Sequence, residues 1–499
     1  MTWGTGGDSA ARLDGSHCRR SASAYTVIAL LLVPALCFAA ACGGEKGSEG
    51  ALLPRTATMA PRRGALPVFE ILAPYTASML HGVENADPDN AENRVVEGLP
   101  AMLRAFQSRS SNWLRSPYHQ HIDATFVPHR ACAYRDVPFE TFLDCVRRVL
   151  PPKDSGFAVE ALRAYHVLAA QQWRQWSGYL GPTARELSRK VQGREGQELS
   201  EMLFGAVGVD PFKLPRFQII LVRQPPGSRL LGAREERSLV LAIGGDRSVA
   251  SLAETAFHEL AHYAVQYSSR IERIEIEFQN FGDIGAIAAN HWNESLATAF
   301  GQGLAASRLN PRFCFQRSMY GNETVDALAH ALYLVWRNDP YLELGPTFAR
   351  RFVNIAKESW PQNKWQRNDF LARAEVYAPT SEALDTFQNR MSAQRFWGRA
   401  PIPANFARDP QAPPMVARII LATPGDLGSA PWVAQSLGIT ADDLRRQPGR
   451  TGKAELWRRQ PNGARLILIL GRTPSLLNEA VTQFWKKGDN APSEGWADL

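Results

Sequence analysis

Two histidines and a glutamate stand together in His258-Glu259-Leu260-Ala261-His262. In an α-helix, positions four apart differ by about 40° in direction and lie one turn apart, so His258 and His262 can bind one metal ion. Glu259 is turned by about 100° from His258, which disfavours it as a third ligand beside the histidines. It can instead act as a general base toward a water molecule that the metal activates. The spacing therefore predicts a metal centre that performs hydrolysis.

The residues around this motif predict a buried helix. Ser251-Leu252-Ala253-Glu254 has the form of a capping box, in which a serine at the start of a helix pairs with a glutamate three residues on. A surface helix with two unrelated histidines would have polar neighbours, whereas this one has an apolar face. That face consists of Leu252, Ala256, Phe257, Leu260, Ala261 and Ala264.

A catalytic zinc site commonly has three protein ligands and an open fourth position. The metzincin pattern is excluded, because Val265 and Ser268 stand where that pattern has glycine and a third histidine. Downstream, Asp283, His291 and Glu294 are the residues that could complete the site.

Glu294 lies in Trp292-Asn293-Glu294-Ser295-Leu296-Ala297, where it begins an Ala-rich helical stretch. Together with the first motif, this sequence resembles the gluzincin zinc metallopeptidases, in which a second helix carries an N-E-x-x-A-like sequence whose glutamate is the third ligand. The resemblance covers roughly residues 215–308. It implies a Zn²⁺ ion bound by His258, His262 and Glu294, with Glu259 as the general base.

The third ligand nevertheless has rivals. Glu294 follows His262 by 32 positions, a longer spacing than in the compact gluzincins. Asp283 falls at the shorter spacing and resembles the variant with an aspartate ligand, and His291 is a further possibility. The helical context favours Glu294, because the glycines on both sides of Asp283 are typical of a turn.

Two short runs rich in β-branched and aliphatic residues, Phe217–Val222 and Ser238–Ile243, precede the metal motif and predict strands. Two strands followed by the metal helix are similar to the small gluzincin sheet, whose edge strand holds an extended peptide by β-augmentation. We expect an α+β, mainly helical fold. It would combine a gluzincin-like catalytic domain, built from a small sheet and metal-binding helices, with a small C-terminal α/β module.

The N-terminus predicts export. Arginines precede an apolar run from Tyr25 to Ala41, too short for a membrane span of about 20 residues, so residues 1–41 are expected to be a lipoprotein-type signal peptide. The run ends in a sequence that resembles a bacterial lipoprotein processing site with Cys42 as the lipidated residue; ordinary cleavage within Ala39–Ala41 is the alternative. Residues 42–63 would form a flexible tether. The protein would then be lipid-anchored in the bacterial cell envelope, on the periplasmic or cell-surface side.

The remaining chain divides into four predicted parts. Residues 64–209 form a helical N-terminal region and residues 210–400 the catalytic region. Residues 401–414 form a Pro-rich linker, and residues 415–490 form a module with the element order β-α-β-β-α. Apolar spacing in the first part predicts helices over 68–83, 95–109, 139–149, 159–176 and 184–207.

Cys132 and Cys145 could form a disulfide in an oxidising compartment, with free buried thiols as the alternative. The formal net charge of +7 is no argument for nucleic-acid binding, because no basic run with interleaved aromatic residues is present.

The sequence thus predicts a membrane-tethered zinc metallopeptidase of the bacterial cell envelope that acts on a peptide or protein substrate. The alternative is a non-catalytic binding or assembly lipoprotein built on a gluzincin-like fold. Gluzincins usually place a tyrosine or histidine near the developing oxyanion. Tyr320, His330 and Tyr333 are available for this role, and the sequence singles out none of them.

Overall fold

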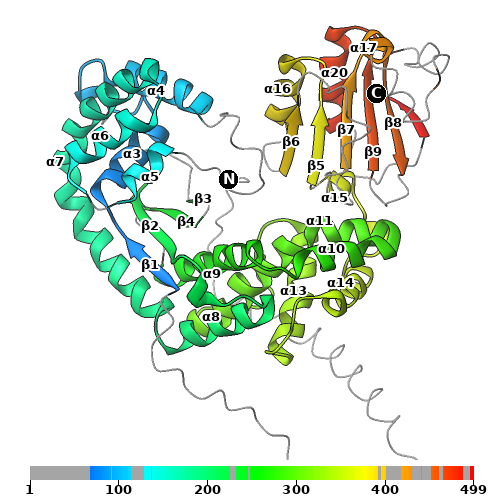
Figure 1. Ribbon diagram of the computed structural model, residues 1–499, viewed down its shortest axis with the longest axis horizontal. Helices are drawn as coiled ribbons and strands as arrows, with labels where there is room; N and C mark the ends of the chain where they lie inside the picture. Colours follow the sequence, from blue (N-terminus) through cyan, green and yellow to red (C-terminus); the bar gives the residue numbers. More distant parts are fainter. Residues whose placement is uncertain are drawn as a thin grey trace, which may run out of the picture.

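The computed structural model describes residues 68–91, 93–113, 128–135, 137–224, 232–235, 237–244, 248–371, 373–390, 395–399, 417–429, 440, 451–459, 465–486 and 495–499. The expected signal peptide, the lipidation site Cys42, the tether and the Pro-rich segment lie outside these residues. The described chain is mostly helical with two small sheets, which agrees with an α+β, mainly helical fold (Figure 1). None of the described helices is both long and apolar enough to span a membrane.

The N-terminal region is helical except at its start, where the predicted first helix is wrong in part. Residues 69–72 form strand β1 (Phe69–Leu72), because their backbone pairs in parallel with Phe217–Ile220. The elements that follow β1 are α3 (Tyr75–Asn85), η1 (Asn93–Val95), α4 (Leu99–Trp113), α5 (Pro128–Ala133), α6 (Phe139–Val149), α7 (Pro152–Val191), α8 (Arg194–Val207) and η2 (Pro211–Lys213).

Helix α7 joins segments that the sequence predicts as separate helices. It runs without interruption for 40 residues and contains Pro182. In Figure 1 it curves around the outer side of the four-stranded sheet, and it packs against β1, β2 and the metal helix α9 (Val249–Gln266). The predicted last helix of the region is also divided, because the chain leaves α7 at Gln192 and re-enters α8 after Gly193.

Two links hold the smaller N-terminal helices together. A disulfide joins Cys132 of α5 to Cys145 of α6. Glu84 of α3 accepts a hydrogen bond from Arg130 Nε at 2.9 Å and lies 3.0 Å from His129 Nε2. These contacts tie α3 to α5, and the disulfide ties α5 to α6.

The first sheet has the strand order β1-β2-β4-β3 and includes both strands expected before the metal motif. These are β2 (Phe217–Arg223) and β4 (Ser238–Ile243), which pair in parallel, while β3 (Gly232–Glu235) pairs antiparallel to β4. All six residues of β4 are buried, as expected for a central strand covered on both faces. The chain passes from β4 into α9, so this sheet positions the start of the metal helix.

Helices that follow α9 form the second layer of the region 210–371. They are α10 (Ile271–Phe278), η3 (Gln279–Phe281), α11 (Gly282–Thr298), η4 (Ala299–Ala305), α12 (Ala306–Leu309), α13 (Glu323–Asn338), α14 (Pro346–Ser359), η5 (Gln362–Lys364) and α15 (Arg367–Leu371). The segments α11, η4 and α12 follow one another without a break, and η4 is a π-helical stretch that packs closely on α9.

The C-terminal module begins earlier in the chain than expected. Its sheet has the order β10-β8-β9-β7-β5-β6, and β5 and β6 come from residues placed in the catalytic region by the sequence. Its elements are β5 (Arg373–Tyr377), α16 (Ser381–Arg390), β6 (Arg395–Arg399), β7 (Ala417–Ala422), α17 (Pro424–Ser429), β8 (Lys453–Arg459), β9 (Arg465–Gly471), α20 (Pro474–Lys486) and β10 (Gly495–Asp498). Among the described residues, the predicted order β-α-β-β-α is present from β7 to α20, with α17 as its first described helix.

Two ion pairs join this module to the helices that precede it. Arg367 of α15 bonds Glu455 of β8, with Nη2 3.0 Å from Oε1, and both side chains are almost fully buried. Arg465 of β9 donates to Asp283 in the first turn of α11 at 2.9 Å. The C-terminal sheet is therefore attached directly to a helix of the candidate metal centre.

Candidate metal centre

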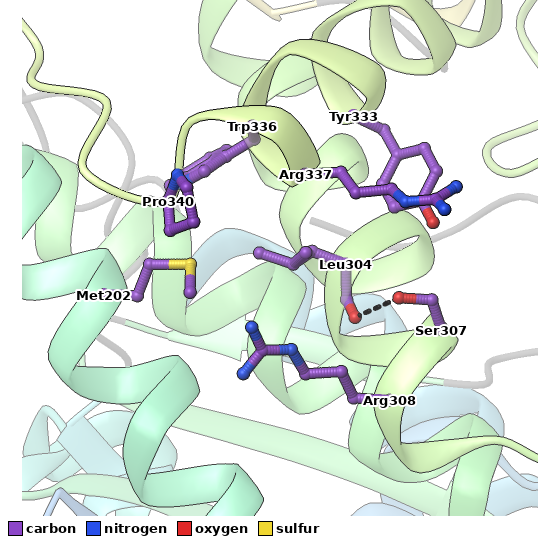
Figure 2. Close-up of a pocket in the computed structure, with 8 residues that line it drawn as sticks. All are labelled: Met202, Leu304, Ser307, Arg308, Tyr333, Trp336, Arg337 and Pro340. Atoms are coloured by element: carbon purple, nitrogen blue, oxygen red, sulfur yellow. Dashed lines mark hydrogen bonds between the residues drawn. The ribbon is translucent and has the colours of Figure 1, made fainter.

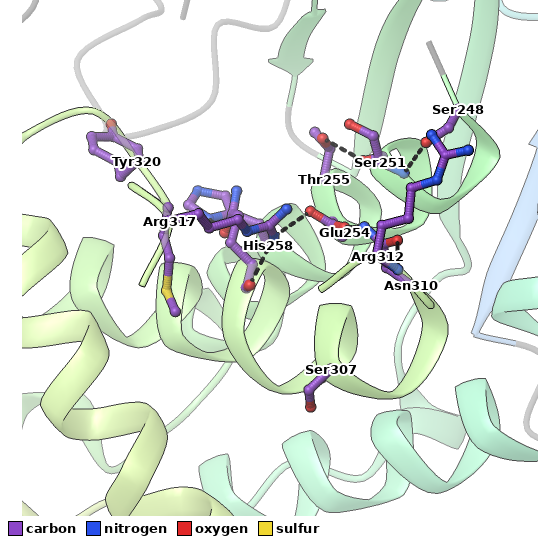
Figure 3. A network of polar contacts seen from close by, with 12 residues as sticks. Ser248, Ser251, Glu254, Thr255, His258, Ser307, Asn310, Arg312, Arg317 and Tyr320 are labelled. Carbon is purple, nitrogen blue, oxygen red and sulfur yellow. Dashed lines mark hydrogen bonds and ion pairs between the residues drawn. The ribbon is translucent and has the colours of Figure 1, made fainter. Parts of the chain in front are cut away.

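The metal helix α9 begins at a different cap from the predicted one. Ser248 is the N-cap residue, and its hydroxyl accepts a hydrogen bond from the backbone of Ser251 at 3.2 Å. The expected capping box is therefore wrong. Glu254 instead accepts hydrogen bonds from Arg317 Nη2 at 2.7 Å and from Asn310 Nδ2 (Figure 3).

Both histidines and the glutamate of the first motif are buried on α9. His258 is 0 % exposed, Glu259 3 % and His262 5 %, which agrees with the apolar face predicted around them. Burying three ionisable groups on one helix is unfavourable unless each has a charge partner, a hydrogen bond or a metal ion. The partners of the histidines come from the helical stretch α11–η4.

Helix α11 starts at Gly282, twelve residues before Glu294, so it is longer than the predicted helical stretch that begins at Glu294. Asp283, His291 and Glu294 all lie on this helix, but they have different partners. Gly282 has a φ of +60°, which permits the sharp turn into the helix. Asp283 lies in the first turn and pairs with Arg465, whereas His291 lies 3.2 Å from the buried Asp369. Within the described residues only His258, His262 and Glu294 form a group of potential metal ligands, with ligand atoms all within 4.8 Å of one another.

The side chains of the three candidate ligands approach one another closely. His258 Nε2 lies 3.0 Å from Glu294 Oε1, His262 Nε2 lies 3.5 Å from Glu294 Oε2, and the two Nε2 atoms are 3.2 Å apart. Tetrahedral ligands at 2.0–2.1 Å from zinc would lie about 3.3 Å from one another. The distance between the two Nε2 atoms, and the distance from each of them to its nearer carboxylate oxygen, are therefore close to the spacing of zinc ligands.

Two amide side chains determine which histidine nitrogens face this point. Gln302 Oε1 lies 3.0 Å from His258 Nδ1, and Asn293 Oδ1 lies 3.1 Å from His262 Nδ1. Because an amide oxygen only accepts hydrogen bonds, these contacts favour the neutral tautomer with the proton on Nδ1 and the lone pair on Nε2. The two Nε2 atoms and the carboxylate are then three acceptors facing one another, an arrangement that a cation stabilises.

The electrostatics of the protein without metal agree with this preference for positive charge. Burial alone would lower the pKa of His258, but the Glu294 carboxylate, assisted by Glu259, raises that pKa above its usual value. Burial would raise the pKa of Glu294, but the two histidines hold that pKa well below its usual range. A positive charge is thus favoured between these side chains, and a divalent cation would supply it.

Glu259 belongs to the site without joining the ligands. It is not part of the group of three converging side chains among the described residues, as its position around the helix predicts. It is close enough to His258 for its charge to raise the pKa of that histidine.

Tyr320 is the aromatic residue that lies beside the histidines. Its ring is nearly parallel to that of His258, with centroids 6.1 Å apart and an interplanar angle of 14°. Asp326 at the start of α13 holds the loop, accepting hydrogen bonds from the backbone of Met319, Tyr320 and Gly321 at 2.9, 2.6 and 3.1 Å. The other two residues considered for an oxyanion role lie elsewhere: His330 Nε2 bonds the Arg317 carbonyl, and Tyr333 is buried against Phe313 and Phe315.

A cavity of about 380 Å³ lies apart from these residues (Figure 2). It is lined by residues of α8, η4, α12 and α13, among them Met202, Arg308 and Trp336. None of the three candidate ligands lines it, so this cavity is not the metal centre.

The sequence indicated part of this site. Asn293 stands next to Glu294 in the second motif, so adjacency to a ligand was a signal for it. Gln302 and Arg317 had no such signal, because their positions depend on the π-helical stretch and on the loop before α13. Tyr320 was one of three residues considered for an oxyanion role, and the sequence could not choose among them.

Compared with protein-family models, with curated proteins and with solved structures, the chain matches none. The resemblance to a metallopeptidase group therefore depends on the two motifs and on the geometry of the residues in them.

Proposed function

We propose that this protein is a zinc-dependent peptidase of the gluzincin type, tethered to a membrane of the bacterial cell envelope. The observation that carries the proposal is the convergence of His258 Nε2, His262 Nε2 and the Glu294 carboxylate: Oε1 lies 3.0 Å from His258 Nε2, Oε2 lies 3.5 Å from His262 Nε2, and the two Nε2 atoms are 3.2 Å apart. Glu259 lies on the same helix as the two histidines. In this proposal it is the general base that peptide hydrolysis requires.

Each residue of the centre has a separate task in this proposal. His258, His262 and Glu294 hold the ion, while Asn293 and Gln302 keep the histidine protons on Nδ1. When bound, zinc polarises the scissile carbonyl and lowers the pKa of a coordinated water to about 7. Glu259 removes a proton from the attacking water and later delivers it to the leaving amine.

The proposed location depends on the N-terminal sequence. The apolar run ending at Ala41, with Cys42 behind it, supports export and lipid attachment. The disulfide between Cys132 and Cys145 is compatible with an oxidising compartment outside the cytoplasm. The substrate would be a peptide or protein of the envelope.

The test replaces the proposed base. In the full chain, Glu259→Gln should keep about one equivalent of zinc and the wild-type melting temperature. It should lower the cleavage of a mixed peptide library, followed by mass spectrometry, by about 10²–10⁴-fold. Glu272→Gln, on the exposed side of α10, is the matched control and should cleave like the wild type.

Two results would count against the proposal. A folded wild-type protein that cannot be loaded with zinc would remove the metal centre. Zinc-loaded wild type and Glu259→Gln that behave alike in cleavage would favour the alternative, a binding or assembly lipoprotein in which the same centre is structural.

A further inference from the structure

The π-helical stretch η4 lies at the contact between the two metal-binding helices. It continues α11 directly after Thr298, and its residues pack on α9 over the turn that carries His258. π-Helical turns are rare and are found frequently at functional sites. Its position next to a ligand therefore raises the question of which side chain it places there.

The wider turn changes the direction of Gln302. In a regular α-helix, a residue eight positions after Glu294 would be turned by about 80° from it. A π turn, with its i→i+5 hydrogen bonds, contains more residues per turn, so Gln302 falls back toward the face that carries Glu294. Glu294 and Gln302 consequently contact the same histidine, with Glu294 at Nε2 and Gln302 at Nδ1 of His258.

A glycine allows this close approach. A Cβ atom at Gly301 would lie 2.6 Å from both Cβ and the backbone nitrogen of His258, and 2.7 Å from the carbonyl oxygen of Glu254. These distances are shorter than any real Cβ contact, so the two helices can meet here only without a side chain. The missing side chain brings the backbone of η4 within reach of His258.

Arg317 forms hydrogen bonds to both α9 and η4. Its Nη2 atom donates to Glu254 Oε2 on α9 at 2.7 Å and to the carbonyl oxygen of Gln302 on η4 at 3.0 Å. Figure 3 shows the Arg317, Glu254 and His258 side chains grouped on one side of the metal helix. One guanidinium group thus joins the backbone of Gln302 to the helix whose histidine Gln302 contacts.

We propose that Gln302, brought to α9 by the π-helical turn, is the positioning residue that holds His258 as a neutral Nε2 ligand. This inference rests on the proposed metal centre. The amide oxygen accepts a hydrogen bond from Nδ1 without adding a negative charge beside the ligand. Partners of this kind commonly change metal affinity by about 10–100-fold when they are replaced.

The test measures metal binding in the full chain without relying on peptidase activity. Gln302→Leu, which keeps the bulk and removes the acceptor, should weaken zinc binding by about 10–100-fold in competition with a chromophoric chelator. Gln302→Glu, which restores an acceptor, should bind zinc at least as tightly as the wild type. Gln171→Leu, on the exposed side of α7, is the control and should leave binding unchanged.

The visible spectrum of the Co²⁺-loaded proteins separates positioning from general damage. The d–d bands of Gln302→Leu should shift relative to the wild type, while those of Gln302→Glu and Gln171→Leu should keep the wild-type pattern. A Gln302→Leu protein with wild-type zinc affinity and an unchanged cobalt spectrum would overturn this inference while the proposed metal centre stands. A folded wild type that binds neither metal would overturn both.

Discussion

Replacing Gly301 by alanine tests how closely the two metal-binding helices must approach. The added methyl group would meet the Cβ and backbone nitrogen of His258 at 2.6 Å, and ordinary contacts begin at 3.4 Å. The helices would therefore have to separate by about 0.8 Å, the difference between these two distances. The neighbouring atoms belong to the helix backbone and to the Cβ fixed to it, and they cannot rotate away.

Gly301→Ala should lower both the stability of the protein and its affinity for zinc. Overpacking of this kind costs about 1–3 kcal/mol, and the higher helix propensity of alanine offsets about 1 kcal/mol, so we expect a net loss of up to about 2 kcal/mol. Metal–ligand distances tolerate only about ±0.2 Å, so a shift of about 0.8 Å at His258 should weaken zinc binding at least tenfold.

Two assays separate these two effects. Urea unfolding in the presence of a chelator gives the stability of the metal-free protein, because bound metal would otherwise shift the transition. Competition with a chromophoric chelator then gives the zinc affinity. Gly178→Ala on α7 is the matched control: apart from its chain neighbours and the backbone of its own helix, no described atom lies within 4 Å of the position that its new methyl group would take. It should therefore stabilise the protein slightly and leave zinc binding unchanged. A Gly301→Ala protein that is as stable as the wild type and binds zinc equally well would refute the argument.

Three further predictions concern other parts of the molecule. Burial acts to raise the pKa of Glu84, but its cationic partners hold that pKa at about 2, so its stabilising contribution is present above about pH 4.5 and is lost as the pH falls toward 2. The stability difference between wild type and Glu84→Gln in urea unfolding should therefore shrink between pH 6 and pH 3, and a constant difference would contradict it. Asp283→Asn should destabilise the protein by about 1–3 kcal/mol, because Arg465 loses a charge partner. The zinc content of this variant should stay at the wild-type value. A loss of zinc would instead indicate that Asp283 is a ligand. Replacing Cys132 and Cys145 by serine should lower stability by about 3 kcal/mol for a loop of this length, and no change in the thermal melt would show that the disulfide does not form.

Local patterns predicted the elements whose residues carry their own signal. β4 is present over the predicted residues, Ser238–Ile243, because an uninterrupted aliphatic run suits a strand buried on both faces. The helix around His258 and His262 followed from its apolar spacing. β1 was missed because Phe69-Glu70-Ile71-Leu72 also fits a helical spacing, and only pairing with β2, far away in the sequence, makes it a strand.

The same difference between local and distant information applies to the metal centre. The spacing of the two histidines is local, and it was sufficient to predict a shared ion. The choice between Glu294 and Asp283 was open, because the partner that occupies Asp283 is Arg465, 182 residues away in the sequence. Gln302 could not be predicted, because the π-helical turn that brings it to His258 has no periodic sequence signal.

The boundary of the C-terminal module shows the limit of composition as a guide. The Pro-rich segment 401–414 suggested a linker between domains, but β5 and β6 before it belong to the same sheet as β7 after it. Glu375 in β5 lies in the sheet interior, where Tyr377 and Arg418 provide its hydrogen bonds. Partners on other strands thus determine the extent of this module.

The most direct test of the central claim is a structure of the zinc-loaded full chain, with the metal identified by X-ray absorption. We predict one zinc ion with His258 Nε2, His262 Nε2 and Glu294 as its protein ligands at about 2.0–2.2 Å, and Glu259 outside the coordination sphere. A folded protein that binds no zinc, or a zinc ion coordinated by Asp283 or His291 in place of Glu294, would contradict it.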